Sequence, residues 1–441
     1  MLDTLIINVP IHDEFVQMTG NLKSIRGSVE DYQIKAVPSY VKKDIETGDL
    51  TLGDSYHPFE SLPTSHSGMA IKFYAVNVAN SNPYISLNAS VKILQGHNVY
   101  GGESVLNLAS EMLNLLNEVY PAFYSCLNIR GATIAKIDST FSVSLPSELL
   151  VQPCLRFLSN IGDGHRKSDT QRDFYNTVYF GGKTSRYGGA KIYGKGHELK
   201  EEITKLQKSA KLGNMRSINK LKVLNPALVD WSKTLLRFES TTKARQLARL
   251  RYPTNLWDFI NYQRDEDKNV LTKLWRYWFD PILSILKGDI MPDIDDSEVY
   301  DLCKANLMSY TKTGKISYTK ANNVYNFYIL LKRDGYEAIK SRYVRRTFDE
   351  NVQNLTALGY GKAVLQNLSL DTVKAVPVSE MVKMDFTKQF PDEYEPIISE
   401  HIYKFAKYLN GGTIEPNKFH NLYDLDGKLL PQAKSNTKGK L

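Results

Sequence analysis

Cysteine is scarce in this 441-residue sequence, and its placement excludes two classes of protein. Cys126, Cys154 and Cys303 are far apart, odd in number and never part of a CxxC pair. A disulfide framework needs paired cysteines, and a cysteine zinc site needs them at short spacing. The sequence therefore indicates neither, and it is typical of a protein from a reducing compartment.

Long apolar runs are also missing. No stretch approaches the roughly eighteen residues that a membrane-spanning helix requires, so we expect no membrane partner. The first residues, MLDTLIINVPIHDEF, carry acids around a short apolar stretch and have no basic leader. This pattern predicts a first strand and no signal peptide.

Several common catalytic motifs are absent from the sequence. No GxGxxG, HExxH or GxSxG occurs. GAKIYGKG fits only the first part of a GxxxxGK[ST] loop, because Gly196 stands where the metal-binding Ser or Thr belongs. Nucleotide hydrolysis, zinc-protease chemistry and serine-elbow chemistry therefore lack motif support.

The charge balance is moderately basic. Lys plus Arg is 56 against 48 for Asp plus Glu, which gives a net charge of +8. An excess of this size is compatible with a polyanionic partner, and equally with a soluble protein that is merely basic.

The order of predicted elements indicates an α+β fold. Alternating runs such as LIINV, MAIKFYAVNV, ATIAKIDSTFSVSL and LLRFESTTKAR predict strands. Helices are predicted over residues 103–119, over residues 147–160 and from Glu198 onward, and residues 162–173 are predicted to be a mobile loop. The sequence thus predicts an N-terminal antiparallel sheet with flanking helices, followed by a mainly helical C-terminal domain.

We place the domain boundaries where the character of the sequence changes. The predicted units are a sheet domain over 1–250, a helical connector over 251–290, a mainly helical domain over 291–425 and a basic disordered tail over 426–441.

Tyr193 is a candidate nucleophile. It ends an apolar run in AKIYGKGHEL, with Lys195 two residues later and Glu198 five residues later. A phenol has a pKa near ~10 and is a weak nucleophile at neutral pH, so a cation beside it, Lys195 or a metal, would favour the phenolate. The alternative is that Tyr193 is one of 27 tyrosines without a catalytic role. Tyr175 and Tyr179 resemble a two-tyrosine nickase pair, and we interpret them as structural strand residues.

Two acidic residues lie within predicted strands, Asp138 in AKIDSTF and Glu239 in LLRFES. A carboxylate in a half-apolar strand needs a partner, and a structural ion pair with Lys or Arg is the plain alternative. Together with Glu198 they would form the oxygen-rich site that Mg²⁺ prefers, and Mn²⁺ is a second choice. His97, in KILQGHNVYGG, is a further candidate ligand or general base, unless it is only a turn histidine.

Basic and aromatic residues interleave between Lys312 and Arg346. Basic side chains suit phosphate contact and rings suit base stacking, so the stretch predicts nucleic-acid binding. The alternative is a helical domain with a solvated basic face and an aromatic core. The candidate DNA-contacting residues, here and in the predicted hairpin before Tyr193, are Lys183, Ser185, Arg186, Lys312, Lys315, Lys320, Arg342, Arg345 and Arg346.

Several stretches are long and unusual enough to point to a known family. They are TGDLTLGDSYHPFESLPT, SGMAIKFY, LQGHNVYG, ATIAKIDSTFS, LLRFE, NLWDFI and VLQNLSL. In these stretches the sequence resembles the gene II replication initiators of filamentous phages. The order IDSTF, YFGGKTSRYGGAKIYGKGHEL, RFE is also similar to plasmid rolling-circle initiators. Two departures stand out. Lys136 replaces the arginine that often precedes Ile-Asp, and no His-hydrophobic-His motif occurs, which favours a carboxylate-dominated site.

The resemblance implies an endonuclease that binds the double-stranded viral origin, nicks the plus strand and stays attached through a 5′-phosphotyrosine. It would later rejoin the displaced single strand. The resemblance further implies host helicase and polymerase as partners, an oligomer on the origin, and the cytoplasm of the infected bacterium as location. By motif match Tyr193 is the nucleophile, and Asp138 and Glu239 fall on the acid motifs. The family also makes a shorter protein from an internal start, for which Met291 is the candidate.

Two other functions fit the sequence. A non-enzymatic origin-binding replication repressor would need only the basic and aromatic C-terminal half. A relaxase or transposase would use the same nucleophile on another substrate. The substitution Tyr193→Phe separates the repressor from the nickase, because only a nickase would lose an activity.

Overall fold

The computed structural model of the protein describes residues 1–410, with gaps. The gaps are residues 46, 48, 164–165, 168–175, 182–183, 265–268, 287–294, 370–381 and 393. Tyr175, Lys183, Met291 and the predicted tail at 426–441 lie outside the described residues. Within the described part, no helix is both long and apolar enough to cross a membrane.

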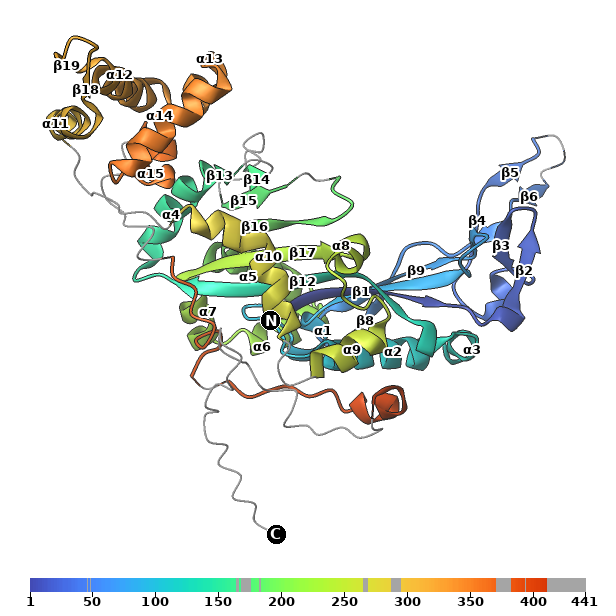
Figure 1. Ribbon diagram of the computed structural model, residues 1–441. Helices are drawn as coiled ribbons and strands as arrows, with labels where there is room; N and C mark the ends of the chain where they lie inside the picture. Colours follow the sequence, from blue (N-terminus) through green and yellow to red (C-terminus); the bar gives the residue numbers. More distant parts are fainter. Residues whose placement is uncertain are drawn as a thin grey trace.

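An eight-stranded antiparallel sheet forms the centre of the N-terminal part (Figure 1). In spatial order its strands are β15 (Thr177–Phe180), β16 (Gly188–Gly194), β17 (Leu235–Lys243), β12 (Thr133–Ser144), β1 (Leu2–Pro10), β11 (Tyr84–Ser90), β9 (Gly68–Tyr74) and β8 (Glu60–Pro63). Every pair of neighbours is antiparallel. The predicted α+β fold with an N-terminal antiparallel sheet is confirmed. Strands β17, β12 and β1 lie side by side although they are distant in the sequence.

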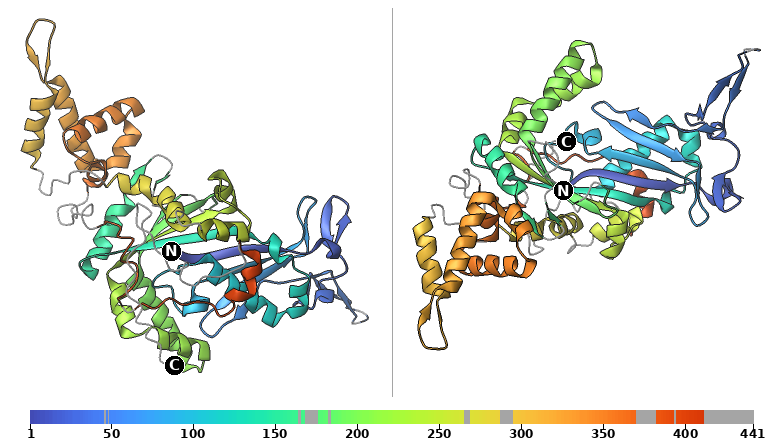
Figure 2. Two further views of the ribbon diagram at one scale, coloured as in Figure 1. Left: turned by 60° about the horizontal axis from the view of Figure 1, so that its bottom comes forward. Right: turned by 90° about the horizontal axis from the view of Figure 1, so that it is seen from above.

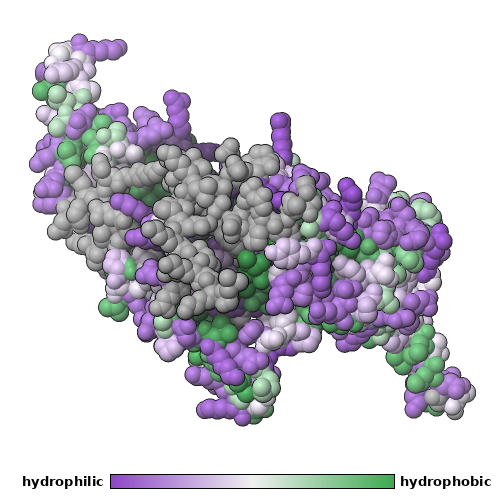
Figure 3. Space-filling view, turned by 90° about the horizontal axis from the view of Figure 1, so that it is seen from below, coloured by the Kyte–Doolittle hydropathy of each residue, from purple (hydrophilic) through white to green (hydrophobic). Residues whose placement is uncertain are grey.

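Shorter strands build an arm that projects from one end of the sheet (Figure 1, Figure 2). They are β2 (Val16–Thr19), β3 (Leu22–Ile25), β4 (Val37–Pro38), β5 (Val41–Lys43), β6 (Leu50–Leu52), β7 (Ser55–Tyr56) and β10 (Val76–Val78). Apolar side chains of β5 and β6 are exposed, and Figure 3 shows hydrophobic surface along this arm. A further pair, β13 (Gly162–Asp163) and β14 (Arg166–Lys167), falls within the predicted loop at 162–173.

Ten helices of the described N-terminal part flank the sheet. They are α1 (Lys92–Gln95), α2 (Val105–Val119), α3 (Pro121–Ser125), α4 (Val151–Ser159), α5 (Lys195–Lys211), α6 (Met215–Val223), α7 (Pro226–Lys233), α8 (Ala244–Arg249), α9 (Leu256–Arg264) and α10 (Val270–Ser284). The helix predicted from Glu198 begins earlier, at Lys195. Gly194 keeps extended backbone and ends the strand directly before it, so no linker separates β16 from α5.

One face of the sheet is apolar, and α2 and α10 pack on it. Leu5 pairs with Ile137, and Phe141 pairs with Phe238, so these four side chains point to the same side. The ring of Trp275 on α10 lies 5.5 Å from that of Phe141 and 6.2 Å from that of Phe238. Since side chains alternate along a strand, the residues between these point to the opposite face.

The second part is mainly helical, as predicted, and has a core of its own that includes Phe327, Tyr328 and Phe348. Its elements are α11 (Asp296–Leu307), β18 (Ser309–Tyr310), β19 (Ile316–Ser317), α12 (Thr319–Asp334), α13 (Tyr336–Arg342), α14 (Arg345–Ala357) and α15 (Lys362–Asn367). Strands β18 and β19 form a hairpin that projects from the helices (Figure 2).

After the helical part the chain returns to the sheet. Val382 and Phe386 join the core around α10, and Ile402 and Phe405 join the core around α2 and α9. We call residues Val382–Asn410 the strap. The unit built around the sheet is therefore discontinuous in the sequence, and the boundaries drawn from the sequence stay predictions.

Candidate active site on the polar face of the sheet

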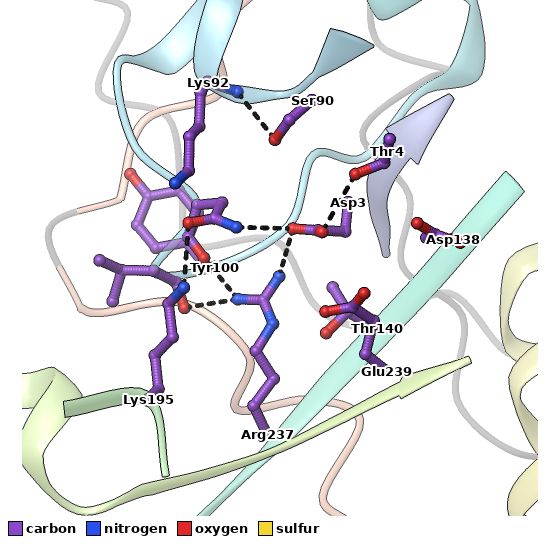
Figure 4. Close-up of polar contacts among 12 residues, drawn as sticks. Asp3, Thr4, Ser90, Lys92, Tyr100, Asp138, Thr140, Lys195, Arg237 and Glu239 are labelled. Carbon is purple, nitrogen blue, oxygen red and sulfur yellow. Dashed lines mark hydrogen bonds and ion pairs between the residues drawn. The ribbon is translucent and has the colours of Figure 1, made fainter. Parts of the chain in front are cut away.

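Three adjacent strands, β16, β17 and β12, place ionisable side chains on the polar face of the sheet. Figure 4 shows those of β12 and β17, Asp138, Arg237 and Glu239. In the register of β16 and β17, Lys191 lies opposite Glu239, and Tyr193 lies opposite Arg237. Asp138 of β12 stands two residues before the partner of Glu239, so it points to the same face. The strand alternation thus gathers predicted site residues that are about a hundred positions apart in the sequence.

Tyr193 and Glu239 form a hydrogen-bonded pair. Tyr193 is only 6% exposed, and its hydroxyl donates to Oε2 of Glu239 at 3.1 Å. Oε1 of the same carboxylate is paired with Nζ of Lys191 at 2.9 Å. Nζ of Lys191 also lies 5.1 Å from the centre of the Tyr193 ring. The phenol proton therefore has a carboxylate as its direct acceptor.

Burial dominates the acidity of this pair. It raises the pKa of Tyr193 well above its usual value, although the charge of Arg237 acts in the opposite direction. Lys195, the cation that the sequence predicts beside the phenol, lies 5.8 Å from the ring centre, but burial dominates the pKa of Tyr193. Burial and the charge of Asp3 also raise the pKa of Glu239. Glu239 therefore holds a proton more strongly than an exposed glutamate does.

Lys195 is fully buried at the start of α5, directly behind β16. Its Nζ donates to Oε2 of Glu198 at 2.6 Å and to Oδ1 of Asn98 at 2.9 Å. The same atom lies 5.8 Å from the centre of the Tyr193 ring. Burial and the neighbouring Arg237 lower the pKa of Lys195 to about 8. Its ammonium group can therefore give up a proton near neutral pH.

Sequence reasoning missed Asp3, Asn98, Lys191 and Arg237. Arg237 is fully buried, and its Nη2 donates to Oδ1 of Asp3 at 2.7 Å. Its Nη1 donates to the backbone carbonyls of Asn98 at 2.5 Å and Val99 at 3.0 Å. Lys191 and Arg237 each stand two residues from a predicted site residue in the same strand, so strand alternation could have predicted that they share its face. No sequence pattern predicts Asp3 and Asn98, because only the tertiary fold places them beside the site.

Each carboxylate of the site is neutralised by one cation. The pairs are Asp3–Arg237 at 2.7 Å, Asp138–Lys136 at 2.7 Å, Glu198–Lys195 at 2.6 Å and Glu239–Lys191 at 2.9 Å. This is the ion pairing that the sequence left open as the alternative for the strand-borne acids. Four negative and four positive charges cancel, which permits Asp3, Asp138, Lys195, Arg237 and Glu239 to be buried close together.

The four residues predicted to bind a metal do not form one ligand set. Across the described residues, no three Asp, Glu, His or Cys side chains lie close enough together to hold a metal ion. His97 is buried in its turn and accepts a hydrogen bond at Nδ1 from the N–H of Val99 at 3.2 Å. Burial, with Lys195 nearby, lowers the pKa of His97 to about 3, so the ring is neutral. Mg²⁺ binding stays a prediction. Of the four predicted ligands, Asp138 and Glu239 on adjacent strands are the two that still support it.

The predicted DNA-contacting residues lie in separate places. Arg186 is exposed in the turn before β16, and Ser185 organises that turn, since its Oγ accepts the N–H of Gly188 at 3.2 Å. Lys183 lies outside the described residues. The remaining six lie on the helical part, on or beside the β18–β19 hairpin and on α13 and α14, and are Lys312, Lys315, Lys320, Arg342, Arg345 and Arg346.

Comparison with known proteins identifies the family. A family model of the N-terminal part of the phage replication-associated protein, the gene II product, matches residues 1–267, and a model of its C-terminal part matches residues 310–397. The chain is 34% identical to the replication-associated protein of Enterobacteria phage M13 over 413 residues, which are 90% of this chain and 99% of that protein. It is 32% identical to the corresponding protein of Salmonella phage IKe over 411 residues, which are 90% of this chain and 97% of that protein.

No solved structure matches the chain at a significant level. The two family models and the nearly full-length similarity to the phage proteins agree with the resemblance carried by the sequence motifs. The chain therefore belongs to the gene II family of phage replication-associated proteins.

Proposed function

We propose that the protein initiates phage DNA replication by nicking one strand of a double-stranded origin with Tyr193 as the nucleophile. The hydrogen bond from Tyr193 to Glu239, set among the cations Lys191, Lys195 and Arg237, is the observation that carries this proposal. The names of the relatives support a role in replication. The combination of an attacking group, a base and fixed positive charge suits phosphoryl transfer.

In the proposed step the Tyr193 oxygen forms a bond to the scissile phosphorus while its proton passes to Glu239. The bond between phosphorus and the 3′ oxygen breaks, and Lys195 donates a proton to that oxygen. The products are a 5′-phosphotyrosine and a free 3′-hydroxyl. A carboxylate with a raised pKa suits the first transfer, and an ammonium with a pKa of about 8 suits the second.

Rejoining is the reverse of this step. A 3′-hydroxyl attacks the phosphotyrosine, and Lys195 and Glu239 exchange their roles as acid and base. One phosphoester is exchanged for another in each direction, so the energy of the broken bond is kept. No nucleotide hydrolysis is required, in agreement with the incomplete GxxxxGK[ST] pattern at Gly196.

We also propose that a divalent cation, Mg²⁺ or Mn²⁺, binds the site together with the DNA. Mg²⁺ is usually held by one or two carboxylates together with substrate phosphates, and not by an all-protein cage. Asp138 and Glu239 are the two carboxylates that would hold it here. The cation would supply charge neutralisation at the scissile phosphate.

For the DNA contact we propose the β18–β19 hairpin. Residues 309–320 contain three lysines and no acid, and the side chains from Tyr310 to Ile316 are exposed. Among the described residues, Lys312, Lys315 and Lys320 have no acidic partner. Unpaired lysines next to exposed rings suit phosphate contact and base stacking.

Two of the three predicted arginines on α13 and α14 have carboxylate partners. Arg342 is paired with Asp334 at 2.6 Å, and Arg345 lies 3.7 Å from Asp349. A DNA phosphate would have to compete with these carboxylates. We therefore favour the hairpin lysines over Arg342 and Arg345 as DNA contacts.

A nicking assay tests the central claim. The purified protein is incubated with supercoiled plasmid carrying the phage origin and Mg²⁺, and the DNA is then digested to find a phosphotyrosyl peptide. We expect a nick and an adduct on the peptide that contains Tyr193, and neither with Tyr193→Phe. An adduct on Tyr175 or Tyr179 would support nicking by a tyrosine but refute Tyr193 as the nucleophile. Origin binding without nicking or adduct would favour the repressor.

A further inference from the structure

The candidate site is closed. Tyr193 and Glu239 are both buried, so a DNA strand reaches them only if a covering segment moves. The segment Gln95–Gly102, which we call the site loop, lies against Asp3, Lys195 and Arg237 of the site (Figure 4). Its Asn98 side chain bonds both Lys195, at 2.9 Å, and Asp3, at 3.1 Å. The site loop thus occupies the polar partners that a phosphate would need.

The strap holds the site loop from the outside. Tyr100 of the loop is buried, and its ring packs edge-on against Phe390 at 5.4 Å and Tyr394 at 5.1 Å. Phe390 and Tyr394 stack on each other with 3.9 Å between ring centres. Tyr100 directly follows the two residues whose backbone carbonyls accept hydrogen bonds from Arg237. The aromatic cluster therefore fixes the backbone that enters the site.

Gln389 fastens the strap to the sheet beside this cluster. Its Oε1 accepts the N–H of Ser142 at 2.8 Å, and its Nε2 donates to the carbonyl of Ser142 at 2.9 Å. The ladder between β1 and β12 runs only as far as the pair Leu2–Ser139. The amide of Gln389 thus takes the place of a strand neighbour where β1 has ended. The hydrogen bonds of this attachment come from one side chain, and Phe386 packs beside it on Phe141 with 4.9 Å between ring centres.

The far end of the strap is attached elsewhere. Oγ of Ser399 donates to Glu111 at 2.9 Å, and Nζ of Lys404 donates to Asn114 at 2.6 Å, both on α2. Tyr408 stacks on Trp257 at 4.7 Å. The far end is therefore held by contacts with α2 and α9 that are independent of the site loop.

We infer that Gln389, Phe390 and Tyr394 are positioning residues that hold the site loop closed, and that DNA binding releases them and exposes Tyr193. The inference rests on the proposed function in one respect, since it assumes that DNA must reach Tyr193. The strap follows the helical part in the chain, and that part carries the proposed DNA-binding hairpin.

Hydrogen exchange of the full-length protein, without DNA, tests whether the strap holds the site loop closed. Tyr394→Ala and Gln389→Leu should each speed exchange of the amides in residues 97–102 about tenfold, the effect expected from losing roughly 1.4 kcal/mol of contact. Tyr408→Ala removes a ring from the far end of the same strap and should leave these amides unchanged. Equal acceleration by Tyr408→Ala, or none by the other two, overturns the inference. Using two different near-end variants guards against one that fails to fold.

The same measurement with an origin duplex bound tests whether DNA binding frees the strap and the site loop. Binding should speed exchange in residues 97–102 and in residues 382–392, a change that a purely structural strap would not show. DNA that binds and leaves both segments equally or better protected overturns the inference. Failure to bind the duplex would count against the proposed function instead, while the comparison without DNA still decides whether the strap holds the loop.

Discussion

The hydroxyl of Tyr193 and the carboxylate of Glu239 are joined by a 3.1 Å hydrogen bond between neighbouring strands. Tyr193 stands two residues beyond Lys191, the residue opposite Glu239, so the bond runs diagonally across β16 and β17. This geometry makes Glu239 the natural acceptor of the phenol proton. It also buries both groups, which raises the pKa of each.

Replacing Glu239 by glutamine should remove that acceptor. Because a neutral amide cannot take the phenol proton at neutral pH, we expect the nicking rate to fall about 10²-fold or more. Origin binding should be unchanged, because the proposed duplex contacts lie on the β18–β19 hairpin and not at Glu239. The measurement is single-turnover nicking beside a filter-binding assay. Glu148→Gln, a change at an exposed acid, is the matched control, and a rate that Glu239→Gln leaves unaltered would rule out the proposed base.

The pH profile of nicking should report Lys195. Its pKa of about 8 means that the ammonium is present below that pH and is lost above it. If Lys195 protonates the leaving oxygen, kcat/KM should decline as the pH rises through about 8. Lys195→Met keeps the length of the side chain but cannot titrate, so the rate should be low and this decline should be absent. A decline that persists in Lys195→Met would assign it to another group.

Glu202 should contribute to stability in a pH-dependent manner. Although burial acts to raise its pKa, Lys92 and Lys220 lower it to about 2. The folded pKa is below the unfolded value, so the stabilisation is complete above pH ~4.5 and is lost as the pH falls toward 2. Glu202→Gln should lower the free energy of unfolding at pH 7 by at most about 3 kcal/mol and have little effect near pH 2.

Denaturant unfolding at several pH values measures this difference. Glu201→Gln, at the neighbouring exposed position, is the control and should cost little at any pH. An equal loss at pH 7 and pH 2 would show that Glu202 acts through packing and not through its charge.

Gly188 should not tolerate a side chain. Its φ is +139°, and a Cβ there would lie 1.9 Å from the backbone carbonyl oxygen of Thr241. Gly188→Ala should therefore cost more than about 3 kcal/mol or prevent folding, because backbone cannot move aside easily. Gly213→Ala is the matched control, with a φ of +81° but nothing within 4 Å of the added Cβ. It should cost only about 1 kcal/mol, and similar melting temperatures for the two variants would contradict the packing shown for β16.

Removing the hairpin lysines should weaken DNA binding and its salt dependence. Each phosphate contact contributes about 0.9 to the slope of log K against log salt on duplex DNA, so Lys312→Ala with Lys315→Ala should reduce the slope by about 1.8. Lys332→Ala, at a lysine paired with Asp296 at 2.6 Å, should leave it nearly unchanged. Binding titrations at several salt concentrations measure both. A slope reduced only by Lys332→Ala would indicate that the DNA phosphates contact the helices and not the hairpin.

The sequence by itself determined the elements and half of the site. Alternating runs defined β1, β12 and β17, and the helical spacing defined α2 and the C-terminal helices, because periodicity is a local property. It also singled out Tyr193, Asp138 and Glu239, since a polar group in an apolar strand is visible without a fold. The start of α5 was placed too late, because the helix follows the strand without a linker.

Only the tertiary structure decided which partners these residues have. Asp3 and Asn98 reach the site through the pairing of β1 with β12 and through the path of the site loop, and both are long-range features. One-to-one ion pairing replaced the predicted four-residue metal set, because buried carboxylates are neutralised by whichever cations the fold brings within reach. No local sequence pattern predicts the return of the strap to the sheet either. Gln389 binds the backbone of Ser142, which is available only because β1 has already ended there.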